Sequence, residues 1–222
     1  MGKKQGNTQG NTQGNTLRRF LIMCIGIAIL SLGIALFKVS LMGNDPSTAL
    51  MMAIGGRIGV DFSIVLLVMN CLFFGVEIVW GRHYIGIGTF VNWFFVGSIA
   101  SLYLRVFEYY HWAPTAFLSR LGVMCIGVLV LSFACSLYQT ADMGIAPYDC
   151  LSLVLRDRTH IQYFWCRIFT DAFCAGVAFL LGGIVGLGTL VCALGLGPFV
   201  QFFTKHAAQS LCGCKKNVPI AG

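Results

Sequence analysis

The stretch RFLIMCIGIAILS at residues 19–31 returns as RLGVMCIGVLVLS at residues 120–132. Both copies contain an arginine, the tetrapeptide Met-Cys-Ile-Gly and a Leu-Ser pair, in the same order and at the same spacing. These matches predict one unit used twice in tandem. A segment in the middle of a chain cannot be a secretory signal peptide, so its N-terminal twin is not expected to be one either.

The correspondence continues downstream at one fixed offset and includes glycine, proline and polar residues. The paired positions are Met42-Gly43-x-x-Pro46-x-Thr48 with Met143-Gly144-x-x-Pro147-x-Asp149, Asn70 with Asp171, and, after a slip of one residue, Gly86-x-Gly88-Thr89 with Gly186-x-Gly188-Thr189. The repeated unit is therefore predicted over residues 19–105 and 120–205, with an aromatic-rich linker at 106–119.

The composition places these repeats in a membrane. The chain is 57% hydrophobic and only 10% charged, whereas a soluble domain carries about 25% charged residues. The lipid bilayer is thus the predicted environment and partner. The net charge of +7 does not indicate nucleic-acid binding, because the basic residues are scattered between apolar runs and do not form one patch.

Each repeat contains three apolar runs of about the length that spans a bilayer. They lie near 20–40, 62–81 and 86–105, and near 121–140, 162–182 and 185–204. The segments 46–58 and 147–158 are shorter and begin with proline, so they are predicted to be half-helices in the membrane or helices on its surface. The predicted fold is all-α, with six transmembrane helices as two inverted three-helix repeats. If the short segments also spanned, the copies would be parallel.

The flanking segments predict the orientation. Residues 1–18 contain QGNT three times and are predicted to be a disordered polar tail, and residues 206–222 to be a cytoplasmic tail. With the N-terminus inside, most Lys and Arg residues flank the cytoplasmic ends of the runs, as the positive-inside rule requires. A multi-pass protein of the bacterial cytoplasmic (inner) membrane, with both termini cytoplasmic, is expected.

The twice-used Gly-x-x-Pro-x-(Thr/Asp)-x-Leu pattern, the later Asn or Asp and the Gly-x-Gly-Thr turn resemble the YczE/YyaS/YitT group of bacterial integral membrane proteins. The resemblance covers nearly all of the chain except the two tails, and it brings no substrate with it. The chain departs from the pattern in its QGNT tail and in having Thr48 where the second copy has Asp149.

Polar residues inside the apolar runs are the first candidates for a functional site. Asp171 lies near the middle of its run, and Arg167 precedes it by one helical turn, a spacing that allows the two to pair. Charged groups at this depth usually face the protein interior. Asp171 and its counterpart Asn70 either belong to a central solute or ion site or bond neighbouring helices as structural glue.

The two Gly-x-x-Pro turns are the second candidates. A helix that begins at Pro46 or Pro147 directs free N–H groups outward, which favours an anion, and Thr48 and Asp149 lie in these first turns. Gly43 and Gly144 form the turns themselves. Alternatively, Asp45 is an N-cap and Asp149 stabilises its own helix, with both loops in water.

The remaining motifs predict no catalysis, cofactor or metal. The Gly-x-Gly-Thr segments lack the Gly-Lys-Ser/Thr ending of a phosphate loop and are expected to be tight turns. Cys212 and Cys214 have no further ligands nearby. No common hydrolase or metalloprotease signature occurs, so no enzyme is expected.

Together these features favour a permease or transporter for a small solute that the sequence does not identify. The alternative is a membrane scaffold or accessory protein that assists another enzyme. The sequence leaves open whether the chain forms a homo-oligomer or binds an accessory subunit. A polar, water-reachable cavity near Asp171 would favour transport, whereas dry packing would favour the scaffold.

Overall fold

The computed structural model describes residues 8–183 and 185–212, and the regular elements in this part of the chain are all helical. They are α1 (Thr8–Val39), α2 (Pro46–Ile58), α3 (Phe62–Trp80), η1 (Arg82–Tyr84), α4 (Ile87–Tyr109), α5 (Phe117–Thr140), α6 (Pro147–Thr159), α7 (Tyr163–Leu180), α8 (Leu187–Phe203), η2 (Thr204–Ala208) and α9 (Gln209–Cys212). The predicted short segments therefore appear as α2 and α6.

Five helices of the described chain are long and apolar enough to cross a bilayer, namely α1, α4, α5, α7 and α8 with its continuation to Leu211. The sixth predicted span is α3, whose apolar part, Ile64–Trp80, is shorter than the usual spanning length. The chain is thus an all-helical, multi-pass membrane protein.

The termini differ in part from the expectation. The helix α1 begins at Thr8 and includes QGNT residues that were expected to be disordered, because extending a formed helix costs far less than starting one. Helices η2 and α9 likewise enter the predicted tail at 206–222. The predictions for residues 1–7 and 213–222, including Cys214, lie outside the described residues.

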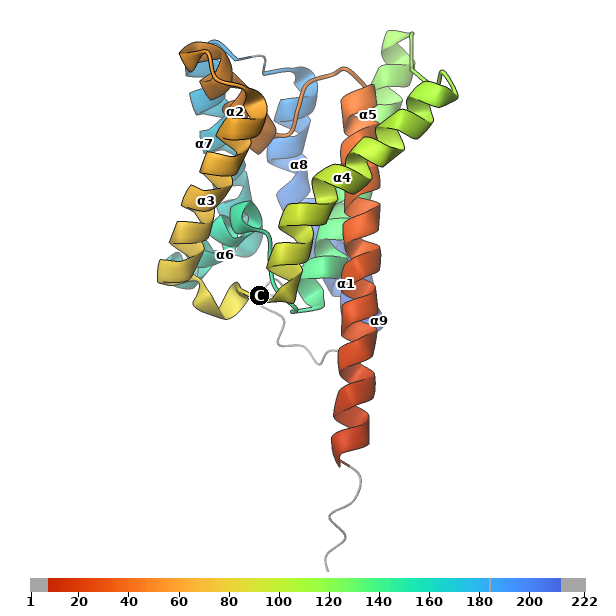
Figure 1. Ribbon diagram of the computed structural model, residues 1–222, viewed down its shortest axis with the longest axis vertical. Coiled ribbons are helices and arrows are strands. Elements are labelled where there is room, and N and C mark those ends of the chain that lie inside the picture. The colour runs from red at the N-terminus through yellow and green to blue at the C-terminus, as the bar shows by residue number, and fades with distance from the viewer. Residues whose placement is uncertain (1–7, 184, 213–222) are drawn as a thin grey trace, which may run out of the picture.

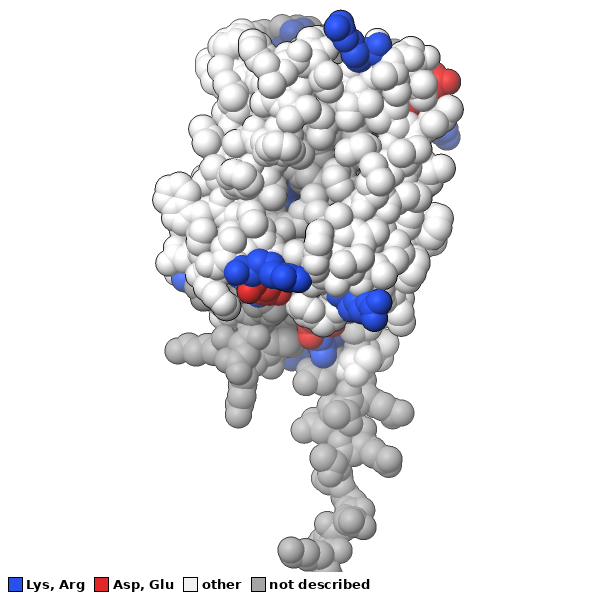
Figure 2. All heavy atoms as spheres, turned by 90° about the vertical axis from the view of Figure 1, so that its left-hand side faces the viewer, with Lys and Arg blue, Asp and Glu red and all other residues white. Residues whose placement is uncertain are grey.

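The surface has the banding of a membrane protein. Figure 2 shows Lys, Arg, Asp and Glu gathered near the two ends of one face, with a broad band between them that is uncharged except for a little blue inside a hollow. Large apolar side chains point outward in this region, and Phe94 on α4 is 68% exposed. Lipid is the solvent that makes such exposure favourable.

The helices α1 and α5 pack against each other along one side of the molecule, on the right in Figure 1. A Cβ atom at Gly33 would lie 2.8 Å from Leu131 Cγ, and one at Gly26 would lie 3.0 Å from the Tyr138 backbone nitrogen. Small residues let two membrane helices approach this closely.

The Gly-x-Gly-Thr segments connect α3 with α4 and α7 with α8, and each docks on the other half of the chain. The N–H of Gly88 donates to the carbonyl of Met143 at 2.7 Å, and the N–H of Gly188 donates to the carbonyl of Met42 at 2.9 Å. The two contacts are reciprocal, because Met42 and Met143 occupy matching positions before α2 and α6.

Unusual backbone conformations also occur in matching pairs. Positive φ angles are found at Leu41 and Asp142 (54° and 50°), at Gly43 and Gly144 (129° and 123°), and at Gly59 and His160 (69° and 58°). Each pair has the offset of the sequence repeat, so the two copies turn their chains alike before and after their short helices.

Gly144→Ala is expected to lower the free energy of unfolding by about 1–3 kcal/mol, because a φ of 123° is nearly restricted to glycine. The new Cβ would also lie 2.7 Å from the Thr89 nitrogen. The matched control is Gly176→Ala, at a helical glycine with open space around it, which should leave stability unchanged or slightly raised. Thermal unfolding in detergent distinguishes the two, and equal midpoints would contradict the docking described above.

Candidate functional site

The short helices α2 and α6 begin at a common cavity in the centre of the molecule. In Figure 1, α2 lies in the upper half and α6 in the lower half, on the side of the molecule away from α1. Residues from the first turn of each, 45–48 and 146–149, line one cavity of about 450 Å³. This volume lies in the range of small-molecule sites.

On the α2 side of the cavity, the acidic residue Asp45 caps the N-terminus of the helix. Asp45 Oδ2 accepts hydrogen bonds from the Thr48 backbone N–H at 3.1 Å and from the Ser47 hydroxyl at 2.8 Å. The expectation that Asp45 is an N-cap is therefore confirmed. The cap neutralises part of the positive charge that this helix end presents to the cavity.

The α6 side is built differently. Its N-cap is Ala146, which offers no side-chain cap, and the acidic residue of its first turn is Asp149. Asp149 accepts hydrogen bonds from the Tyr138 hydroxyl of α5 and from the Arg167 guanidinium of α7. Asp149 lies in the first turn of α6, where an acid stabilises the helix as the alternative required, and it is held in addition by two donors on neighbouring helices.

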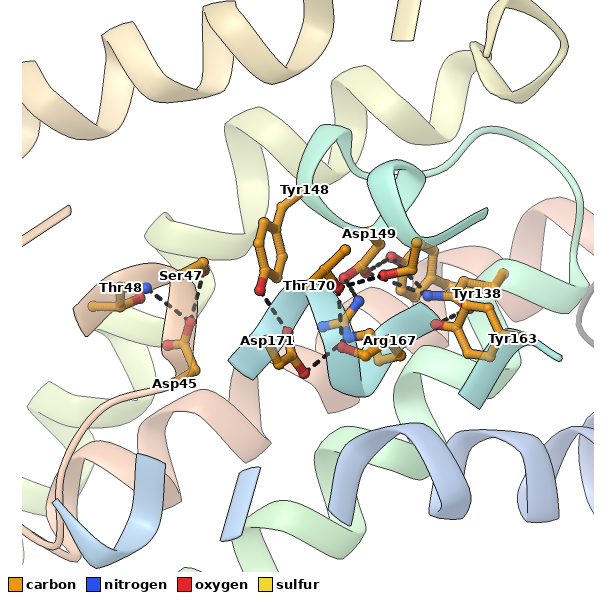
Figure 3. Close-up of polar contacts among 12 residues, drawn as sticks. Asp45, Ser47, Thr48, Tyr138, Tyr148, Asp149, Tyr163, Arg167, Thr170 and Asp171 are labelled. Carbon is orange, nitrogen blue, oxygen red and sulfur yellow. Dashed lines mark hydrogen bonds and ion pairs between the residues drawn. The ribbon is translucent and has the colours of Figure 1, made fainter. Parts of the chain in front are cut away.

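Arg167 joins two buried carboxylates (Figure 3). Its Nη1 donates to Asp149, and its Nε donates to Asp171 Oδ2 at 3.2 Å. Tyr148, the residue after the proline of α6, donates its hydroxyl to the other Asp171 oxygen. Buried charges persist only when paired and hydrogen-bonded in this way, so the predicted pairing of Arg167 with Asp171 is present in the structure.

The cavity contains four of the five residues singled out as candidates for a solute or ion site: Thr48, Asn70, Asp149 and Arg167. Asp171 is fully buried and is not part of the cavity wall; it is bonded to two residues of the wall, Arg167 and Tyr148. Pro46 and Pro147 line the cavity, whereas Gly43 and Gly144 lie in the turns that dock on Gly186 and Gly86.

Sequence reasoning missed several participants. Asn92 of α4 lines the cavity and is 8% exposed; as an amide inside an apolar run, it gave the same signal as Asn70. Tyr138 and Tyr148 gave no comparable signal, because tyrosines near span ends ordinarily indicate interfacial anchoring.

A second cavity, of about 620 Å³, lies between α2, the end of α1 and the residues that follow α7. Its charged lining residues are Lys38 and Arg57, and Lys38 also lines the central cavity. We call it the outer vestibule, after the predicted orientation, in which the end of α1 faces outward. Its lining carries positive charge only.

The far end of α6 is anchored to η1. Tyr84 donates its hydroxyl to Asp157 at 2.7 Å, and Arg156 donates to the Tyr84 oxygen at 3.2 Å. Burial alone would raise the pKa of Asp157, but the hydrogen bonds from Arg156 and Tyr84 outweigh it and lower that pKa. This cluster fixes α6 at one end, while Arg167 and Tyr138 hold it at the other.

The arrangement can bind and orient a polar solute. Within the described chain, no three His, Cys, Asp or Glu residues form a set that could hold a metal ion. Asp149 and Arg167 at the cavity are bonded to each other and to Tyr138 across α5, α6 and α7, so a ligand entering there would meet two charges that are already positioned.

Comparisons with known proteins identify a family and several relatives of this chain. Residues 17–205 match the model of a family of unknown function, DUF6198. An uncharacterised protein of Haemophilus influenzae is 31% identical over 190 residues, with 85% of this chain and 84% of that protein covered. Two Bacillus subtilis proteins also match: the uncharacterised membrane protein YczE is 22% identical and the uncharacterised protein YyaS is 28% identical, with 85% and 92% of their lengths covered.

No solved structure matches this chain. The relatives confirm the resemblance to the YczE and YyaS proteins that the repeated motif indicated. With a family model that covers the whole helical body from α1 to α8, the chain belongs to the family DUF6198.

Proposed function

We propose that the protein is a permease or transporter for a small solute. The observation that supports this best is the central cavity, where the first turns of α2 and α6 meet beside Arg167 and Asp149. In secondary transporters, interrupted helices direct their ends at the substrate near the middle of the bilayer. A scaffold would have no need for a cavity of this size beside buried charges.

The proposed architecture has six spans, counting α3, in two inverted repeats. The reciprocal bonds of Gly88 and Gly188 and the paired positive φ angles support the internal repeat. The opposite positions of α2 and α6 in Figure 1 support inversion. Alternating access would then move one half of the molecule against the other around the central cavity.

Both termini are expected on the cytoplasmic side of the inner membrane, because an even number of spans returns the chain to its starting side and Lys and Arg are in excess there. Reporter fusions at Lys4 and Gly222 measure this. Fusions at Tyr110, between α4 and α5, should report the periplasm. A periplasmic signal from either terminus would exclude the six-span arrangement.

Uptake into vesicles tests the proposed function. The purified chain would be reconstituted and screened with labelled small solutes, with protein-free vesicles as background. Saturable uptake of at least one solute supports transport. A folded, inserted protein that moves none of the solutes that its cavity can hold would favour the accessory role.

A further inference from the structure

We infer that the central cavity binds its solute through an oxyanion group, with positively charged Lys38 and the amide of Asn92 among the donors. This inference rests on the proposed function and deepens it, since it assigns a chemical class to the solute. It depends on which polar groups of the cavity are already occupied and which are open.

The acidic groups at the cavity are largely occupied by protein donors. One oxygen of Asp149 accepts a hydrogen bond from Arg167, and the other accepts hydrogen bonds from Tyr138 and Gln139. Asp171, which lies behind the cavity lining, accepts hydrogen bonds from Tyr148 and Arg167. Asp45 uses one oxygen to cap α2. A cationic solute would have to compete with these donors for nearly every carboxylate oxygen.

Two donors at the cavity have no partner among the described residues. Asn92 lines the cavity at 8% exposure, and its buried Nδ2 has no hydrogen-bond partner in the described chain. A buried amide without a partner costs about 1–3 kcal/mol, so a solute that accepts from it recovers that energy. The Lys38 ammonium lines the same cavity and forms no ion pair with the described residues.

The neighbouring outer vestibule also carries positive charge. Lys38 and Arg57 are the charged residues of the outer vestibule, which shares Lys38 with the central cavity. Positive charge close to the central cavity raises the local concentration of anions and lowers that of cations. The α6 end, which has no side-chain cap, adds the partial positive charge of a helix N-terminus.

Binding can be followed by the fluorescence of Trp93, which lines the cavity. The full chain, in non-ionic detergent without added lipid, would be titrated with the potassium salts of acetate, sulfate and phosphate, and with glycerol and choline chloride. Trp93→Phe identifies the part of the signal that comes from the cavity. A saturable change is expected with at least one oxyanion, and the anion that binds tightest distinguishes a carboxylate from an inorganic oxyanion.

Two variants test the named donors. Lys38→Gln, at an exposed position, and Asn92→Asp, which replaces the open donor by a carboxylate, should each weaken oxyanion binding at least tenfold. Lys205→Gln and Gln209→Glu are the matched controls, since Lys205 is exposed beyond α8 and Gln209 also has a buried amide nitrogen without a partner. Neither control lines the cavity, and neither should change binding.

The results separate this inference from the proposed function. Oxyanion binding without uptake would leave the inference standing and reject transport. Saturable binding of glycerol or choline but of no oxyanion, no saturable response to any of the three oxyanions, or unchanged affinities in both Lys38→Gln and Asn92→Asp, would overturn the inference. Uptake of an uncharged solute at the parent rate in Lys38→Gln would overturn it while transport itself stands.

Discussion

Replacing Arg167 by methionine is expected to lower the free energy of unfolding by about 3–5 kcal/mol, the largest effect of any single change considered. Arg167 is buried and is the cation that pairs with both Asp149 and Asp171. Its removal leaves two buried carboxylates without the cation that pairs with both, and a buried charge without its partner is costly. Thermal or denaturant unfolding of the purified protein measures the loss.

Two further variants show whether the loss comes from charge. Arg105→Met removes an exposed arginine of α4 and should stay within about 0.5 kcal/mol of the parent. The triple variant R167M/D149N/D171N removes all three charges and should recover part of the stability lost in Arg167→Met, because it leaves no unpaired carboxylate. A triple variant that is less stable than Arg167→Met would contradict the ion-pair explanation.

Asp171→Asn is expected to reduce solute uptake at least tenfold, equivalent to about 1.4 kcal/mol, while the protein stays inserted and folded. The amide keeps the size of the carboxyl group and can still accept from Tyr148. It removes the charge that holds the Arg167 Nε, so the guanidinium is fixed by Asp149 alone. Uptake in vesicles and thermal unfolding are measured on the same preparation.

Asp171→Leu distinguishes a functional role from a structural one. It leaves the Tyr148 hydroxyl without its acceptor and Arg167 with one carboxylate, so stability should fall by about 2–5 kcal/mol. The exposed carboxylate of Asp142, paired with Arg19, supplies the control Asp142→Asn. If Asp171→Asn transports like the parent while only Asp171→Leu loses stability, Asp171 is structural glue.

Much of the fold followed from the sequence because the signals were periodic and repeated. Apolar length located the long helices, and the two prolines located α2 and α6 to within one residue at each end. The spacing of Arg167 and Asp171 by one helical turn predicted their ion pair. These are local properties, so a single chain read in order is sufficient to find them.

The cavity could not be predicted in the same way. Asp149 lies in the first turn of α6 and equally suits a helix-stabilising role. Only the packing of α5 and α7 brings Tyr138 and Arg167 to its carboxylate. Lys38 ends α1 like any interfacial lysine, and its place in the cavity depends on where α2 begins. Contacts between distant segments leave no spacing pattern in the sequence.

Chemical accessibility of Asn70 tests the central claim, that the two short helices frame a cavity that water and solutes reach. Asn70→Cys would be treated with a charged, membrane-impermeant maleimide in sealed vesicles, with the parent, whose ten cysteines set the background, and with Ala178→Cys, at a fully buried position, as controls. The account predicts modification of Asn70→Cys from at least one side of the membrane, slowed by a bound solute. Folded Asn70→Cys that stays as unreactive as Ala178→Cys from both sides would contradict it.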